Sequence, residues 1–279
     1  MAVPLDAPLP PTVEDIEVGL LLDGVYRHYG YDFRDYALSS LRRRVRHVVQ
    51  EEGLTTVSGL QEKVLHDFDC LQRFVLALSV NVTSMFRDPA FYKALRERVV
   101  PVLHTYPKVR IWHAGCSTGE EAYSFAILLE EEGLYDRCHI YATDMNETVL
   151  KMAAAGEVPL RGMRENTANY IQSGGRRAFA SFYTAVGDRA VLHPSLRRNI
   201  AFAQHNLVTD RSFNEFNVVF CRNVLIYFNR DLQERVHRLF YQSLVRFGFL
   251  ALGSKETVRF SPHEAAYQDL GERLYRKVA

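Results

Sequence analysis

The sequence has few of the features that mark metal-binding, secreted or nucleic-acid-binding proteins. Its 279 residues include only four cysteines, without a CxxC pair, which argues against a disulfide framework or a cysteine-based zinc site. The ten histidines show no HExxH or comparable spacing, so we predict no metal. A formal net charge of +1 lacks the basic excess of a nucleic-acid-binding domain. We therefore expect no nucleic-acid partner.

Long apolar runs are also missing. The run from Val218 to Leu225 is interrupted by Arg222 and Asn223, and it is far shorter than the roughly 20 residues of a membrane-spanning helix. Residues 1–12 are rich in proline and lack the basic and apolar regions of a secretion signal, which predicts a loose tail. We expect a cytoplasmic monomer without direct membrane insertion.

The first part of the chain after this tail has a helical pattern. Between residues 13 and 82, apolar residues recur at three- and four-residue spacing, as at Leu38, Leu41, Val45 and Val48. Nothing in this range has the alternation of a strand. A small all-helical domain of about four helices is predicted here, followed by a linker segment and a further helix over residues 83–108.

From residue 109 to residue 279 the pattern changes to short apolar strands that alternate with helices. Such alternation predicts an open α/β sheet with parallel strands and right-handed crossovers. A Gly187-Asp188 pair between two β-prone runs indicates a hairpin inserted at about residues 178–198. Ligands bind such sheets at the carboxyl ends of the strands. The expected strands cover residues 109–114, 139–143, 200–205, 217–221 and 249–253.

The loop after the first expected strand is a candidate ligand cradle. It runs from Gly115 to Glu121 and combines small residues with the start of a helix, which lets a ligand approach the backbone closely. Glu120 and Glu121 would repel a pyrophosphate. A cationic ligand without phosphate, such as S-adenosylmethionine, fits better. The alternative is that both acids only favour the helix dipole in the first turn.

Asp144 follows the second expected strand. An acid at this place can accept hydrogen bonds from both ribose hydroxyls of a nucleoside. An aspartate at the end of a strand can equally serve as the N-cap of the next helix, so this position alone leaves two interpretations open.

Three motifs together resemble the CheR-type chemotaxis receptor methyltransferases. They are Asn81–Asp88, Gly115–Glu121 and Cys221–Phe228, and the resemblance spans nearly the whole chain. It implies a Rossmann-like class I methyltransferase domain beneath a small all-helical N-terminal domain, with S-adenosylmethionine as the cofactor and S-adenosylhomocysteine as its product. It also implies methyl transfer to glutamate side chains in the cytoplasmic helical domain of a chemoreceptor or a similar signalling protein.

The resemblance assigns roles to individual residues. Arg87 and Tyr227 would face the substrate, where the arginine fork can bind a carboxylate and the tyrosine offers a hydroxyl and a flat face. A glutamate carboxylate is ionised at neutral pH, so no general base is needed. Outside the motifs, Arg87 would read as a surface residue and Tyr227 as a core aromatic. The implied cofactor-binding residues are Asn81, Thr83, Arg87, Gly115, Glu121, Asp144, Asn206, Leu207, Arg222 and Asn223.

The basic stretch Leu41–His47 has a second implied role. Arg42, Arg43 and Arg46 would dock onto the acidic helical bundle of the receptor. The alternative is a solvated helix face balanced by Glu51 and Glu52. The resemblance also links the hairpin near Gly187 to a subdomain that binds a receptor tethering peptide in some relatives, although its turn is short here.

Departures from the family pattern leave other functions open. Met85 stands where an aromatic is common, Ala122 where a proline often begins the helix, and Ser254–Glu256 where a His-Ser-Glu run is usual. These departures indicate a subfamily with a different protein substrate. The alternatives are a methyltransferase for a small molecule or RNA, and a non-catalytic adaptor that kept the fold.

Overall fold

The computed structural model describes residues 11–79 and 83–278. The chain divides into two compact units, Met1–Val80 and Asn81–Ala279. Within the described residues, no helix is both long and apolar enough to cross a membrane.

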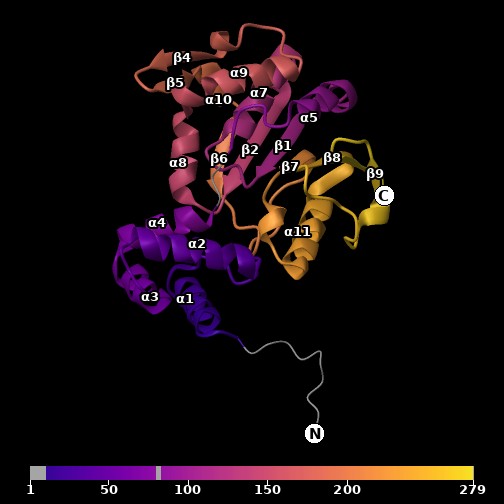
Figure 1. The fold of residues 1–279 in the computed structure, drawn as a ribbon. Coiled ribbons are helices and arrows are strands. Elements are labelled where there is room, and N and C mark those ends of the chain that lie inside the picture. Colours follow the sequence, from indigo (N-terminus) through magenta and orange to yellow (C-terminus); the bar gives the residue numbers. More distant parts are fainter. Residues whose placement is uncertain (1–10, 80–82, 279) are drawn as a thin grey trace. The chain divides into compact units, whose positions relative to one another are not determined.

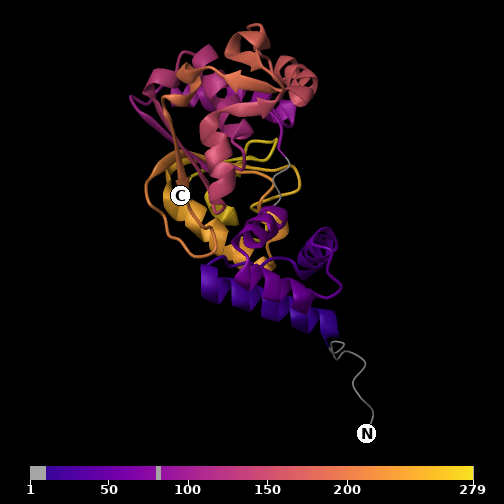
Figure 2. The same cartoon turned by 90° about the vertical axis from the view of Figure 1, so that its left-hand side faces the viewer.

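In the described residues 11–79 of the first unit, the elements of regular secondary structure are all helices, which confirms the predicted all-helical domain. Thr12 begins the first helix with a capping box closed by Asp15, and Gly30 ends it in a left-handed conformation. Thr56 and Asp67 cap the third and fourth helices. Figure 2 shows these helices as a bundle of their own. They are α1 (Val13–Tyr29), α2 (Leu38–Glu51), α3 (Val57–His66) and α4 (Phe68–Leu78).

The second unit starts with a short irregular segment and then a helical one. The helical part is formed by α5 (Pro89–Ala94), the π-helical turn η1 (Leu95–Val99) and α6 (Val100–Leu103). Pro89 stands at the first position of α5, where its missing N–H costs nothing.

A seven-stranded sheet forms the centre of the second unit (Figure 1). The five predicted strands are present and pair in parallel. Two further strands at one edge are antiparallel, so the sheet is mixed where only parallel pairing was predicted. In spatial order the strands are β6 (Ile200–Gln204), β2 (Cys138–Asp144), β1 (Val109–Ala114), β7 (Phe216–Cys221), β8 (Leu244–Leu252), β10 (Leu274–Lys277) and β9 (Tyr267–Asp269).

The helices after β1, β2 and β7 make the crossovers between parallel strands. All six residues of β7 are buried, as expected for a central strand covered on both faces. The α-helices that follow β1 along the chain are α7 (Glu120–Glu131), α8 (Glu147–Ala155), α9 (Met163–Gln172), the short α10 (Pro194–Arg197) and α11 (Arg230–Ser243). Short 3-10 turns are η2 (Tyr135–Arg137), η3 (Leu160–Gly162), η4 (Phe179–Phe182), η5 (Leu225–Tyr227) and η6 (Glu264–Ala266).

The inserted hairpin is formed by β4 (Tyr183–Val186) and β5 (Arg189–Leu192), which pair antiparallel. A third strand, β3 (Glu157–Pro159), pairs with β5. This small sheet therefore begins before the range predicted for it, because three residues are too few to show an alternating pattern. In Figure 1 it lies with α9 and α10 at one end of the second unit.

The strand order identifies the edge of the sheet at which a ligand is expected to bind. From β1 the chain continues to β2 and β6 on one side, and later to β7 and β8 on the other. The order therefore reverses between β1 and β7. In open α/β sheets the crevice at the carboxyl ends of the strands at this switch point is where ligands bind.

Candidate functional site

The sheet brings most of the predicted cofactor residues to one edge. Gly115 follows β1, Asp144 ends β2, Asn206 follows β6, and Arg222 follows β7. These four strands are neighbours in the sheet and run in parallel, so their carboxyl ends lie together. Asn81 lies outside the described residues, whereas Thr83 is described and is half-buried.

The loop after β1 is held tightly against its neighbours. The N–H groups of Gly115 and Cys116 both donate to the Thr143 carbonyl oxygen, at 2.8 and 2.9 Å. Gly115 has a φ of 77°, and a Cβ added there would lie 2.6 Å from Val224 Cγ2. The absence of a side chain at Gly115 therefore lets the loops after β1 and β7 approach each other.

Asp144 connects the ends of β1 and β2. Its Oδ2 accepts from the Ser117 N–H at 3.0 Å, and its Oδ1 accepts from the Asn146 N–H at 3.0 Å. The N-cap of α8 is Asn146, whose side chain accepts from the Thr148 N–H, so the N-cap interpretation of Asp144 is wrong. Burial raises the pKa of Asp144, and its backbone hydrogen bonds oppose that rise.

Asp144→Ala should weaken the binding of S-adenosylhomocysteine by about 1.5–3 kcal/mol, the contribution of a hydrogen bond to a charged group. In the role expected for Asp144, its ionised carboxylate accepts from both ribose hydroxyls of the cofactor, whereas the protonated form has less acceptor capacity. Because the pKa of Asp144 is raised, wild-type affinity should fall on acidification at a higher pH than for an ordinary aspartate. Isothermal titration at several pH values should show the loss of affinity on acidification in the wild type and not in Asp144→Ala. Asp136→Ala, at an exposed carboxylate, is the matched control.

A cluster of charged side chains around the buried Arg222 lies beside this loop. Glu121 Oε1 is 3.0 Å from His113 Nδ1, and Glu121 Oε2 accepts from Arg222 Nη1 at 3.0 Å. Arg222 also donates from Nη2 to Asp88 Oδ2 at 2.7 Å, and its guanidinium lies 3.9 Å from the Phe91 ring centroid. Burial alone would raise the pKa of Glu121, but the His113 hydrogen bond and the Arg222 charge hold it below its usual value. Glu121 is therefore an anion.

The same cluster holds the backbone around Arg87. Arg222 Nη2 donates to the Arg87 carbonyl oxygen at 3.3 Å, and the Phe86 N–H donates to Ser124 Oγ of α7 at 2.9 Å. Phe86 and Asp88, on either side of Arg87, have φ values of 52° and 61°. Non-glycine residues in this left-handed region are strained, and such strain is concentrated at functional sites.

The remaining predicted site residues lie in loops and are only partly buried. Asn206 uses its side-chain oxygen to accept from the Val208 N–H at 2.9 Å, which shapes the loop after β6. Leu207, Asn223 and Tyr227 are half-buried, whereas the neighbouring Phe228 is buried. The interpretation of Tyr227 as a core aromatic therefore fits Phe228 instead.

Sequence reasoning missed two members of the charge cluster. His113 lies in strand β1 and is completely buried, stacked on Phe220 with ring centroids 4.3 Å apart. A histidine between the apolar residues Trp112 and Ala114 was the available signal. Asp88 stood inside a quoted motif without a role, and no local pattern pairs it with Arg222, which is 134 residues away.

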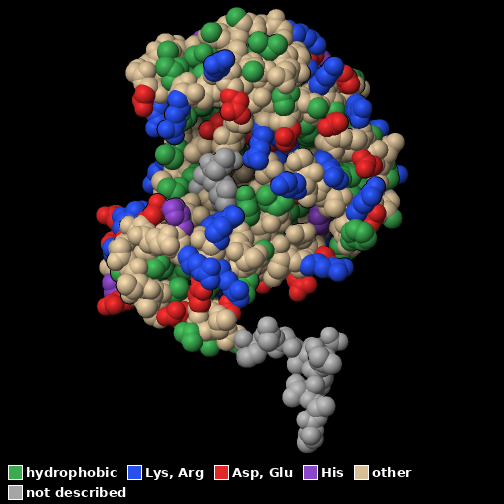
Figure 3. All heavy atoms as spheres, in the orientation of Figure 1, with side chains coloured by type: hydrophobic (Ala, Val, Ile, Leu, Met, Phe, Trp, Pro, Cys, Tyr) green, Lys and Arg blue, Asp and Glu red, His purple; other side chains and the backbone are tan. Residues whose placement is uncertain are grey.

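The arginines of α2 are less available than predicted. Arg42 pairs with Asp15 and Arg46 pairs with Glu14, both on α1. Arg43 is exposed. A surface hollow of about 660 Å³ runs along this part of α2, and basic side chains gather over α2 in Figure 3 with acidic ones among them.

One of the two acids expected to balance this helix face contacts it. Glu51 approaches His47, at 3.3 Å between Oε1 and Nε2. Glu52 pairs with Lys63 and Arg73 instead. The carboxylates that pair with Arg42 and Arg46 belong to α1, since the packing of α1 and α2 decides which carboxylates come within reach.

Comparisons with known proteins agree with this geometry. The family description "CheR methyltransferase, all-alpha domain" matches residues 16–79, and "CheR methyltransferase, SAM binding domain" matches residues 81–272. Cher3 of Pseudomonas putida is 49% identical over 265 residues, covering 94% of this chain and 97% of the relative. The chemotaxis protein methyltransferase of Listeria monocytogenes is 30% identical over 256 residues, covering 91% and 94%. The chain belongs to the CheR methyltransferase family.

Proposed function

We propose that this protein transfers the methyl group of S-adenosylmethionine to a glutamate side chain in the cytoplasmic helical domain of a chemoreceptor or a related signalling protein. One observation carries the proposal. At one edge of the sheet lie together the Gly115 loop, Asp144 and the Glu121–Arg222–Asp88 cluster. The proposed setting is cytoplasmic, with the chain acting as a monomer and without nucleic acid or metal.

The residues at this edge fit the proposed cofactor. S-adenosylmethionine carries a sulfonium and an ammonium cation, and carboxylates are supplied by Glu121 in the first turn of α7 and by Asp144 at the end of β2. Glu121 would hold the amino end and Asp144 the ribose. Gly115 lets Val224 approach closely, since a Cβ at residue 115 would collide with it, so the loops after β1 and β7 lie close together beside the proposed cofactor. Thr83, Asn206, Leu207 and Asn223 complete the proposed lining, together with Asn81.

The proposed reaction needs orientation and no proton transfer. A carboxylate oxygen of the substrate attacks the methyl carbon, and the electron pair of the carbon–sulfur bond goes to sulfur. A cation and an anion become a neutral thioether and a neutral ester. Arg87 would hold the substrate carboxylate and Tyr227 would flank it. Good orientation of two reactants can lower such a barrier by roughly 7–11 kcal/mol.

The protein substrate is inferred from the family and from two relatives. Curated relatives from Listeria monocytogenes and Vibrio cholerae carry the name chemotaxis protein methyltransferase. The Arg43 side of α2, with its surface hollow, is the proposed docking face on the helical unit. Arg42 and Arg46 would have to exchange their partners on α1 to take part.

Labelled S-adenosylmethionine incubated with the protein and a lysate of its host should yield a labelled protein band. Mild alkali should remove the label, because a carboxyl methyl ester hydrolyses under conditions that leave N-methyl groups intact. Label that survives alkali, or that enters RNA or small molecules, would contradict the proposal.

Isothermal titration separates an enzyme from an adaptor that kept the fold. The proposed enzyme should bind both S-adenosylmethionine and S-adenosylhomocysteine, whereas an adaptor that lost the site should bind neither.

A further inference from the structure

The loop after β7 carries three of the proposed site residues but has little regular structure of its own. We call residues 222–227 the β7 loop. It contains Arg222, Asn223 and Tyr227, and only its last three residues form a 3-10 turn. Buried backbone N–H groups need hydrogen-bond acceptors. Three N–H groups of this loop donate to one side chain from a different part of the chain, Glu256.

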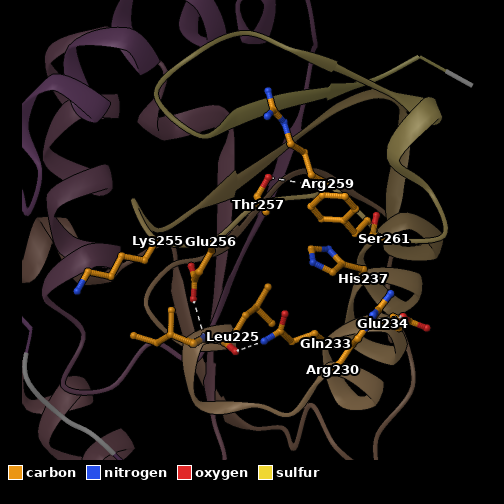
Figure 4. Close-up of a pocket in the computed structure, with 12 residues that line it drawn as sticks. Leu225, Arg230, Gln233, Glu234, His237, Lys255, Glu256, Thr257, Arg259 and Ser261 are labelled. Carbon is orange, nitrogen blue, oxygen red and sulfur yellow. Dashed lines mark hydrogen bonds and ion pairs between the residues drawn. The ribbon is translucent and has the colours of Figure 1, made fainter. Parts of the chain in front are cut away.

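Glu256 accepts four backbone hydrogen bonds. Its Oε1 accepts from the N–H groups of Val224 and Ile226 at 2.8 and 3.3 Å. Its Oε2 accepts from the N–H groups of Asn223 and Gly253 at 2.9 and 2.6 Å. Glu256 is only 4% exposed. In Figure 4 its carboxylate points toward the segment that carries Leu225, away from the solvent-facing Lys255.

The four donors come from two loops that follow neighbouring strands. Asn223, Val224 and Ile226 follow β7, and Gly253 directly follows β8. Gly253 has no space for a side chain, since an added Cβ would lie 2.7 Å from both Asn223 N and Glu256 Oε2. Asn223 has a φ of 62°, a strained conformation that the surrounding contacts must maintain.

Only an ionised carboxylate of this length suits the arrangement. Each oxygen of Glu256 accepts from two N–H groups. A glutamine would place its own NH₂ group against two of those donors, and an aspartate is one methylene too short to reach them from the same backbone.

We propose that Glu256 is a positioning residue for methyl transfer. Its carboxylate holds the β7 loop so that Arg222 can bridge Glu121 and Asp88 while Asn223 and Tyr227 face the cofactor and the substrate. This inference rests on the proposed function, and it adds a residue that touches neither the cofactor nor the substrate.

Glu256→Gln should lower kcat by about 100-fold, the effect of a displacement of about 1 Å in a catalytic group. The KM for the protein substrate should change much less, since the docking face on α2 is untouched. Glu264→Gln is the matched control, because Glu264 is exposed and accepts one backbone N–H, that of Phe260, at 2.8 Å. Activities are compared at a temperature where circular dichroism shows that each variant is folded.

Gly253→Ala tests the same contact without removing the carboxylate. The added methyl group must displace Asn223 or Glu256, so the same pattern of lowered kcat is expected. Should Glu256→Gln fail to fold, Glu256→Asp keeps the charge and should show an intermediate loss. Near wild-type kcat in folded Glu256→Gln, or an equal loss in Glu264→Gln, would overturn the proposal.

The affinity for S-adenosylhomocysteine distinguishes failure of the role proposed for Glu256 from failure of the proposed methyl transfer. This binding needs no protein substrate, and displacement of Asn223 and Arg222 should weaken it by roughly tenfold, as for one lost hydrogen bond. Weakened binding in Glu256→Gln and Gly253→Ala would support the role of Glu256 even if the wild type methylates no protein. Unchanged affinity in both variants would refute that role while leaving the proposed reaction intact.

Discussion

Arg222→Leu should destabilise the protein by about 3–5 kcal/mol, the effect of breaking a buried ion pair by removing one partner. The variant leaves the half-buried Glu121 without its cation, next to the buried His113. It also releases Asp88 and the Arg87 carbonyl oxygen, both held by Arg222. We therefore expect binding of S-adenosylhomocysteine to be lost together with stability. Urea unfolding and isothermal titration measure the two effects.

Two control variants distinguish the loss of the contacts made by Arg222 from the loss of a positive charge in general. Arg222→Lys keeps a cation, but an ammonium cannot bridge two carboxylates as a planar fork does or stack on Phe91 in the same way, so a partial loss is expected. Arg230→Leu removes an exposed arginine that pairs with Glu234 and should cost less than about 1 kcal/mol. Equal effects of Arg222→Leu and Arg230→Leu would show that the cluster has no special importance.

Arg87→Ala should abolish methyl transfer while the backbone contact with Arg222 is kept. The proposed task of the side chain is to hold the substrate carboxylate through a bidentate pair. The contact with Arg222 uses the backbone carbonyl of residue 87, which alanine retains. Loss of orientation should lower kcat by at least about 100-fold. Single-turnover assays with labelled cofactor measure this loss directly.

The matched control for this variant is Arg164→Ala, at an exposed arginine of α9. It should leave transfer and stability unchanged. Wild-type transfer by Arg87→Ala would remove Arg87 from the site and would require another cation to orient the substrate. A large loss of stability would instead indicate that the side chain supports the strained backbone at Phe86 and Asp88.

The parallel strands could be predicted because each is a short apolar run. Val109–Ala114 was predicted with the bounds that the structure shows, and β7 is buried throughout. The shortest antiparallel strands could not be predicted in the same way. β9, at the edge of the large sheet, and β3, in the small sheet, have three residues each, so they owe their conformation to pairing with neighbours and not to their own pattern.

The candidate site was predictable where its residues are close in sequence. The Gly115–Glu121 loop and the Cys221–Phe228 motif each combine a strand end with a turn, and this local chemistry is visible in the residues. Glu256 was noticed only as part of a departure from the family pattern. Its four hydrogen bonds include three to residues at least 30 positions away, which no spacing rule reveals.

The sequence alone determined the class of the protein: a helical unit, an α/β sheet and a cradle for a cationic cofactor, because strands, helix caps and glycine turns follow from neighbouring residues. Only the tertiary structure decided which charges meet. Arg222 joins Glu121 and Asp88, whereas Arg42 and Arg46 are paired with α1. Ion pairs act over a few ångströms, and the partner within that distance depends on how distant segments pack.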